Sequence, residues 1–162
     1  MLAETPAPDL DDRGRTSAGA EPVRRAAVVI HPAKHDDMDE FRAAVRTAMA
    51  DLGWAEPLWL ETRPDDTGER LAREAVRSGV DLVLASGGDG TITACAGGVA
   101  GSGVPLGVLP CGTGNLLARN LGLPLPLDEA LSVALTGSGR RLDVGIANGP
   151  AVPGDGRDRI RR

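Results

Sequence analysis

Two short glycine-rich segments hold the residues whose types and spacing could carry out chemistry. The first reads Ser-Gly-Gly-Asp-Gly-Thr at 86–91, and the second reads Pro-Cys-Gly-Thr-Gly-Asn at 110–115. Ten of the 22 glycines fall between Ser86 and Gly114, so glycine is concentrated here. Glycine lets a backbone approach a ligand closely, and the free N–H groups at the start of a helix attract phosphate. Both segments therefore predict anion-binding turns.

Asp89 stands out in the first segment, because a carboxylate beside a bound phosphate is repulsive unless it serves a cation or a proton. A magnesium ion held by Asp89, directly or through water, would remove this conflict. We therefore predict that Asp89 is the metal ligand and a catalytic residue. The alternative interpretation is a tight strand-to-helix turn in which Asp89 or Thr91 only caps the helix.

The second segment favours a functional interpretation, because it also follows an apolar strand and leads into a helix. Both turns would then share one edge of a sheet, where Thr113 and Asn115 could hydrogen bond to the ribose or phosphates of a nucleotide. Arg119, one helical turn beyond Asn115, could face the same pocket or be an ordinary surface arginine.

Two other phosphate-binding motifs can be compared with the chain. It has no Gly-x-x-x-x-Gly-Lys-Ser/Thr sequence, and its only lysine, Lys34, lies elsewhere, which excludes a P-loop. The Gly112-Thr113-Gly114 triplet looks like part of a dinucleotide-binding fingerprint, but the third glycine and the ribose-binding acid are missing. The dinucleotide interpretation is therefore weak.

The elements that must position the two segments are short apolar runs alternating with stretches of helical periodicity. The sequence predicts strands at Ala26–Ile30, Trp54–Leu60, Asp81–Ala85, Leu106–Leu109 and Arg141–Ile146. It predicts helices at Asp36–Leu52, Thr67–Gly79, Thr91–Ala100, Asn115–Leu121 and Leu127–Leu135, the second one capped by Thr67. Pro57 places the second strand near a sheet edge.

This order of elements predicts an α/β fold of three layers, in which a mostly parallel sheet has helices on both faces. Ligands of such sheets bind beyond the carboxyl ends of the strands, where both glycine-rich segments fall. Residues 1–25 and 149–162 are polar, contain glycine and proline, and lack apolar periodicity. We predict disordered ends around a folded domain at 26–148.

Length and composition indicate a soluble globular protein of 162 residues, of which 41% are hydrophobic, 25% charged and 2% aromatic. The net charge of −5 argues against nucleic acid as a partner, and the apolar runs are too short to cross a membrane. Cys95 and Cys111 lack the spacing of metal ligands and follow no secretory signal, which favours a cytoplasmic location. Because few basic side chains could offset a bound triphosphate, the acidity also favours magnesium.

Residues 26–148 resemble the N-terminal, nucleotide-binding half of the diacylglycerol kinase catalytic family, which includes sphingosine kinases and bacterial lipid kinases. The resemblance rests on four features: His31-Pro32 after the first strand, GGDGT at Gly87–Thr91, PCGTGNLLAR at Pro110–Arg119, and LDVG at Leu142–Gly145. GGDGT is shared with the NAD kinases. The segment at 110–119 resembles the lipid-kinase branch and is the most specific of the four.

The resemblance implies a nucleotide-binding domain similar to those of NAD kinase and phosphofructokinase. It also implies ATP as phosphoryl donor, Mg²⁺ as cofactor, and a lipid hydroxyl such as that of diacylglycerol as acceptor. Carried over by position, Gly87, Gly88, Asp89, Gly90 and Thr91 would line the triphosphate and its metal. The other nucleotide wall would be formed by Pro110, Gly112, Thr113, Gly114 and Asn115.

The chain departs from the family pattern in two places. The family usually has asparagine before the proline of the first strand, where this chain has His31, which could bind the nucleotide or be an ordinary loop histidine. Lys34 could reach a phosphate. The family also has a second, mostly β domain with the lipid pocket and an acidic residue proposed as general base, whereas here the resemblance stops at Asn148. We interpret the chain as a truncated or frameshifted product that binds nucleotide weakly and has little or no kinase activity.

Two alternative functions stay open at this point. GGDGT alone would also suit an NAD kinase-like enzyme. The chain could instead be a non-catalytic nucleotide-binding or regulatory domain that pairs with a partner, including a second copy of itself. The stretch Leu121–Leu127 could meet such a partner or make peripheral contact with a membrane surface, or it could pack in the core.

Overall fold

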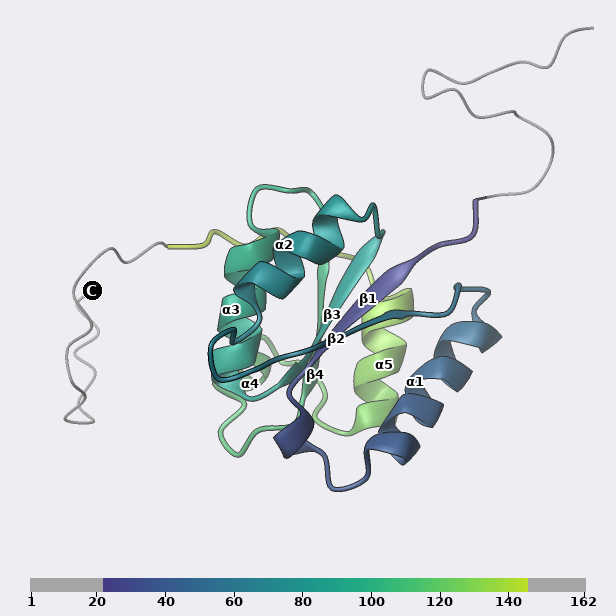
Figure 1. Cartoon of the computed structure of the whole chain (residues 1–162), viewed down its shortest axis with the longest axis horizontal. Helices are drawn as coiled ribbons and strands as arrows, with labels where there is room; N and C mark the ends of the chain where they lie inside the picture. The colour runs from purple at the N-terminus through teal and green to yellow at the C-terminus, as the bar shows by residue number, and fades with distance from the viewer. Residues whose placement is uncertain (1–21, 146–162) are drawn as a thin grey trace, which may run out of the picture.

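Four parallel strands form the central sheet of residues 22–145, the part of the chain that the computed structural model describes. They are β1 (Ala26–Ile30), β2 (Leu58–Glu61), β3 (Leu82–Gly87) and β4 (Leu106–Pro110), in the order β2-β1-β3-β4 (Figure 1). The predicted parallel sheet is confirmed, with β2 at an edge. Most of the two ends predicted to be disordered, at 1–21 and 149–162, lies outside the described residues.

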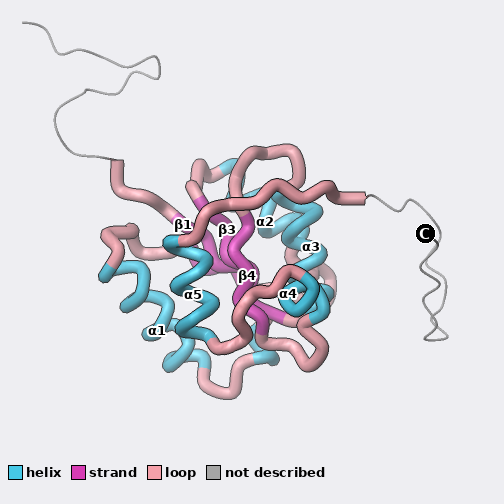
Figure 2. Tube along the Cα trace, turned by 180° about the vertical axis from the view of Figure 1, so that it is seen from behind, coloured by secondary structure: helices cyan, strands magenta, loops and turns pink. Residues whose placement is uncertain are grey.

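Helices cover both faces of the sheet. The helices α1 (Met38–Asp51) and α5 (Leu127–Thr136) lie on one face, and α2 (Glu69–Arg77) and α3 (Asp89–Val99) lie on the other (Figure 1 and Figure 2). A 3-10 helix, η1 (Pro32–Lys34), and the short α4 (Leu116–Asn120) follow β1 and β4. This arrangement confirms the predicted three-layer α/β fold. Between residues 22 and 145, no helix is both long and apolar enough to cross a lipid bilayer.

The central strands send alternate side chains into two hydrophobic cores. From β1, Val28 and Ile30 pack with α1 and α5, whereas Val29 packs on the side of α2 and α3. From β3, Leu84 joins the first core and Val83 the second. Because both faces are covered, these strands read as continuous apolar runs rather than as alternating ones.

Helix α1 shows how local sequence signals set an element's ends. Asp37 is its N-cap and accepts a hydrogen bond from the Glu40 N–H at 2.8 Å. Phe41, Val45 and Met49, spaced by four residues, form its buried face. The chain turns out of the helix at Gly53.

The second strand is shorter than predicted, because it begins at Leu58 and not at Trp54. Pro57 has no N–H to donate to a sheet, which explains why the ladder starts just after it. The Trp54 N–H instead donates to the Met49 carbonyl at 2.9 Å, so Trp54 completes the end of α1.

The predicted Thr67 cap of the second helix is wrong. Helix α2 begins at Glu69, its N-cap is Gly68, and no side chain caps it. The Gly68 N–H donates to Asp66 Oδ1 at 3.0 Å, and Gly68 has a φ of +127°, which disfavours a residue with a side chain. Asp66 therefore closes this turn, and Thr67 is left exposed at the edge of the sheet.

The predicted last strand is also absent from the described residues 141–145, and Ile146 lies outside them. Leu142 and Val144, whose alternation suggested a strand, are 52% and 51% exposed. No strand of the described sheet pairs with this segment. An apolar alternation forms a strand only where a ladder and a covered face are both available.

Candidate functional site

A cleft of about 560 Å³ opens at the carboxyl ends of β1, β2 and β3. Three loops form it: η1, the turn between β2 and α2, and Gly87–Thr91, here called the first glycine loop. Its volume is typical of small-molecule sites. The lining residues are His31, Pro32, Ala33, Lys34, Thr62, Arg63, Pro64, Thr67, Gly88, Gly90 and Thr91.

The first glycine loop joins β3 to α3 and leaves its backbone open toward the cleft. Gly88 is the N-cap of α3, and no side chain caps this helix. A Cβ on Gly90 would meet no atom within 4 Å, whereas a Cβ on Gly87 would lie 2.7 Å from the Cβ of the buried Thr91. The N–H groups in the first turn of α3 therefore remain for a ligand or solvent, which suits an anion.

The Asp89 side chain is directed toward the loop after β4 and is not among the residues that line the cleft. Its Oδ1 accepts a hydrogen bond from the Leu117 N–H, in the first turn of α4, at 3.3 Å. Neither Asp89 nor Thr91 caps α3. The simple capping interpretation of this segment is therefore not what the structure shows, and Asp89 connects two loops.

The segment Pro110–Asn115, here called the second glycine loop, packs against the first. A Cβ on Gly112 would lie 2.7 Å from the Gly88 Cα, so the two backbones are already in contact. Asn115 has a φ of +50°, and its Oδ1 accepts a hydrogen bond from the Gly112 N–H at 2.9 Å. Arg119 Nε donates to the Gly114 carbonyl at 3.0 Å. These contacts brace the loop internally.

The structure thus separates the predicted site residues into two groups. His31, Gly88, Gly90 and Thr91 line the cleft, and Gly87 supports them from the end of β3. The cleft lining includes none of the five predicted residues of the second glycine loop, of which Thr113 and Gly114 are exposed. Their contact with a nucleotide remains a prediction.

His31 replaces the asparagine of the family pattern and lies at the inner edge of the cleft. Its backbone N–H donates to the Ser86 carbonyl at 2.9 Å, which fixes it beside the end of β3. Its Nδ1 is buried and has no hydrogen-bond partner among residues 22–145. Buried polar atoms are usually paired, so this atom can serve a bound group.

A cluster of three polar side chains, Ser86, His35 and Cys111, links the loops around the site. The buried Ser86 Oγ lies 3.1 Å from His35 Nε2 and 3.8 Å from Cys111 Sγ, and the last two atoms are 3.5 Å apart. Burial raises the pKa of the Cys111 thiol, while the Ser86 hydrogen bond and the charge of Lys34 oppose this. The cluster connects η1 to both glycine loops.

The pH dependence of stability should report on this cluster. Burial lowers the pKa of His35 below its ordinary value of 6.5, the neighbouring His31 adds to this, and Asp36 opposes it. Because the unfolded chain then binds a proton more readily than the folded chain, the free energy of unfolding should fall as the pH drops below 6.5. We expect urea denaturation at several pH values to show that the free energy of unfolding falls more steeply below pH 6.5 in the wild type than in His35→Gln. The same fall with pH in both proteins would show that His35 is not its cause.

Sequence reasoning did not identify Thr62, Arg63 and Thr67 as site residues. They lie in the turn after β2, far in sequence from both glycine-rich segments, and no motif marks them. Only the sheet order, with β2 beside β1 and β1 beside β3, brings this turn to the cleft.

Parallel α/β layers, a glycine loop between strand and helix, and a cleft at the strand ends define the class: an α/β domain with a cleft at the carboxyl edge of its parallel sheet. The family model of the diacylglycerol kinase catalytic domain matches residues 25–147, and the chain belongs to this family. The match confirms the predicted resemblance to this family.

Several known proteins are similar to this chain in sequence or structure. A probable lipid kinase YegS of Salmonella typhimurium is 34% identical over 127 residues, covering 76% of this chain and 42% of the relative. A probable YegS-like lipid kinase of Chromohalobacter salexigens is 50% identical over 82 residues, covering 48% of this chain and 26% of the relative. A diacylglycerol kinase structure from Bacillus anthracis matches with a TM-score of 0.61 at 25% identity, covering 74% of this chain and 46% of that one. The chain spans less than half the length of these relatives.

Proposed function

We propose that the chain binds ATP in the cleft beside the first glycine loop and holds it as phosphoryl donor for a lipid hydroxyl. One observation carries the proposal: the first turn of α3 faces the cleft through Gly88 and Gly90 without a capping side chain. A phosphate there would accept hydrogen bonds from free N–H groups at the positive end of an 11-residue helix. Because Gly90 has no Cβ, the phosphate can approach the backbone closely.

The second glycine loop has two parts in this proposal. Its backbone contact with Gly88, through Gly112, holds the first glycine loop in place. Thr113 is exposed and offers a hydroxyl to a nucleotide that extends beyond the cleft. Gly112 and Asn115 act as supporting residues, because the Asn115 side chain already bonds to the loop.

Asp89 lies between the lining residues Gly88 and Gly90 and would supply the protein carboxylate for magnesium, although its side chain is directed toward α4 in this structure. Among residues 22–145 no three His, Cys, Asp or Glu side chains gather into a metal site, so a cage made only of protein ligands is not available. Mg²⁺ commonly takes one or two carboxylates, the phosphates of its substrate and several waters. Asp89 can supply the carboxylate, since only its Oδ1 has a hydrogen bond in the described structure. When bound, the ion would neutralise phosphate charge.

We further propose a lipid hydroxyl, such as that of diacylglycerol, as the acceptor. The relatives bear the name of probable lipid kinases, and the similar solved structure is described as a diacylglycerol kinase. Phosphoryl transfer depends chiefly on positioning and charge neutralisation, which the first glycine loop and a cation can provide. A cytoplasmic protein in peripheral contact with a membrane would reach both substrates.

Isothermal titration with ATP, with and without magnesium, tests the role of Asp89. Asp89→Asn keeps an Oδ1 that can accept the Leu117 N–H but removes the negative charge. We expect the wild type to bind ATP more tightly with magnesium than without it. In magnesium, the affinity of the variant for ATP should be about tenfold lower than that of the wild type, since a charged contact contributes about 1.5–3 kcal/mol. The same magnesium dependence in both proteins would assign Asp89 to loop structure alone.

A further inference from the structure

The charges that line the cleft differ in sign from the charge of the chain. The whole sequence has a net charge of −5, yet none of the residues that line the cleft is an aspartate or a glutamate. The charged lining residues are Lys34 and Arg63, and together they are called the cationic wall. Such segregation in an acidic protein indicates a site for an anion.

Backbone hydrogen bonds on both sides of Lys34 hold its main chain in place. Its N–H donates to the His31 carbonyl at 3.0 Å, and the His35 N–H that follows donates to the Pro32 carbonyl at 3.2 Å. The His35 ring is in turn held by Ser86, 3.1 Å away.

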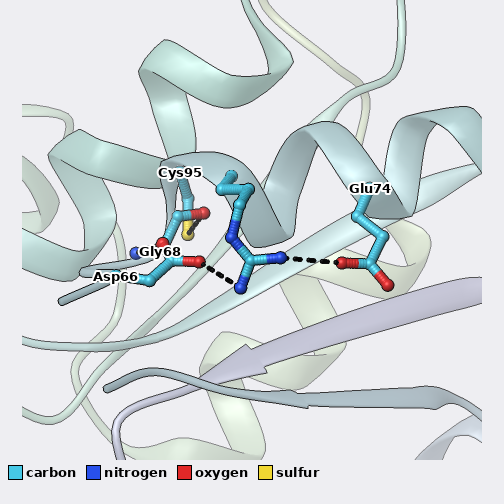
Figure 3. A network of polar contacts seen from close by, with 5 residues as sticks. Asp66, Gly68, Glu74 and Cys95 are labelled. Carbon is cyan, nitrogen blue, oxygen red and sulfur yellow. Dashed lines mark hydrogen bonds and ion pairs between the residues drawn. The ribbon is translucent and has the colours of Figure 1, made fainter. Parts of the chain in front are cut away.

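Arg63 lies in a closed turn with Asp66, whose carboxylate already has partners. Arg63 and Asp66 exchange two backbone hydrogen bonds of 3.0 Å each. The Asp66 carboxylate accepts the Gly68 N–H at 3.0 Å and pairs with Arg70 at 2.9 Å, and Arg70 also pairs with Glu74 (Figure 3). The Asp66 carboxylate is therefore paired with helix α2 and not with Arg63.

Neither Lys34 nor Arg63 forms an ion pair with any side chain in residues 22–145. By contrast, Arg42, Arg46 and Arg73 are paired with glutamates. His31, whose buried Nδ1 also lacks a partner there, lines the same cleft. Unpaired donors thus line the same cleft as the first glycine loop.

We infer that the cationic wall binds the phosphates of the nucleotide together with the first glycine loop, so that part of the binding is independent of magnesium. The inference rests on the proposed ATP site and adds its charge partners. The ligand class is an anion with at least two linked phosphates, since Lys34 supplies a point charge and Arg63 a planar fork that can contact two oxygens. Binding should weaken as phosphates are removed from the nucleotide.

The test is isothermal titration of the whole chain with ATP, ADP, AMP and inorganic tripolyphosphate, in magnesium and in EDTA. Lys34→Gln, Arg63→Gln and the double variant are compared with Arg77→Gln, which removes the same charge at the far end of α2. We expect each single variant to lose about tenfold of its affinity for ATP in EDTA, and the double variant more. AMP should be least affected, and Arg77→Gln should match the wild type.

The outcomes separate this inference from the proposed function. If the wild type binds Mg-ATP and the Lys34 and Arg63 variants keep wild-type affinity in EDTA, the cationic wall is wrong and the ATP site stands. If tripolyphosphate binds with the expected dependence on Lys34 and Arg63 but ATP does not, the wall stands and the proposed function is wrong. A wild type that binds neither ligand contradicts both. An equal loss of ATP affinity in Arg77→Gln would show that only the net charge of the protein matters, and the inference about the cationic wall would be wrong.

Discussion

Replacing Gly98 with valine is expected to lower the free energy of unfolding by about 3 kcal/mol, the upper end for overpacking a well-filled core. Gly98 lies where α3 crosses α2. A Cβ there would lie 2.5 Å from the Glu69 carbonyl oxygen and 2.6 Å from the Ala72 Cβ. Neither atom belongs to a flexible side-chain end, so the two helices would have to move apart.

The neighbouring glycine of α3 provides a matched control. A Cβ on Gly97 would make only an ordinary contact of 3.7 Å with the Glu69 side chain. Gly97→Ala should therefore stabilise the protein by about 0.5–1 kcal/mol, the gain of alanine over glycine within a helix. Urea denaturation followed by circular dichroism measures both. A Gly98→Val protein as stable as the wild type would show that α2 and α3 are not packed through this residue.

The packing at Gly98 also bears on the site. Helix α3 begins at the first glycine loop, and α2 begins just after Thr67, so a shift of one helix against the other would move lining residues of the cleft. A small residue where the helices cross allows their close approach. Variants at Gly98 that still fold should therefore bind nucleotide more weakly than their loss of stability alone would cause.

The second large effect is expected from Gly112→Ala. The added Cβ would lie 2.7 Å from the Gly88 Cα, a backbone atom that no rotamer change can move. The first glycine loop must then shift, and with it the N–H groups proposed to bind phosphate. We expect Mg-ATP affinity to fall at least tenfold, equivalent to about 1.4 kcal/mol, together with a measurable loss of stability.

The variant Gly90→Ala separates the effect on ATP affinity from the effect on stability. A Cβ on Gly90 meets nothing within 4 Å, so the folded structure accepts it, and alanine should be favoured in α3 by about 0.5–1 kcal/mol. The same Cβ faces the cleft, so ATP binding should weaken while thermal stability stays the same or rises. Gly112→Ala with wild-type ATP affinity would contradict the proposed support of one loop by the other.

The fold could be predicted largely from local signals. Ala26–Ile30 matches β1 at both ends, because a buried parallel strand is a continuous apolar run bounded by residues that stop it. The predicted element ends were wrong where a second local interaction competed with the one that the sequence indicated. Thr67 can cap a helix, but Asp66 closes the turn first, and Gly68 takes a conformation that only glycine adopts readily.

The site could be predicted only in part. The first glycine loop carries its own sequence signature, and Gly88, Gly90 and Thr91 of it line the cleft. The sequence placed the second glycine loop on the same edge, but it could not show that the Gly112 and Gly88 backbones touch, since that depends on the register of β3 against β4. Arg63 was missed for a related reason, because its place at the cleft depends on strand order rather than on a motif.

The charge of the chain also has a different meaning in three dimensions. The low number of basic residues suggested that only magnesium could offset a triphosphate. The structure places two of these basic residues, Lys34 and Arg63, in the cleft and leaves acids out of its lining. Net charge describes the average surface, whereas binding depends on the few side chains that face the ligand.

The central claim is that nucleotide binds in the cleft between the first glycine loop and the turns after β1 and β2. Backbone NMR titration of the chain with Mg-ATP tests it most directly, because every N–H group reports its own position. We expect the largest shift changes at 31–34, 62–67 and 88–91, and little change on the outer faces of α1 and α5. No saturable shifts, or shifts centred on α1 and α5, would contradict the account.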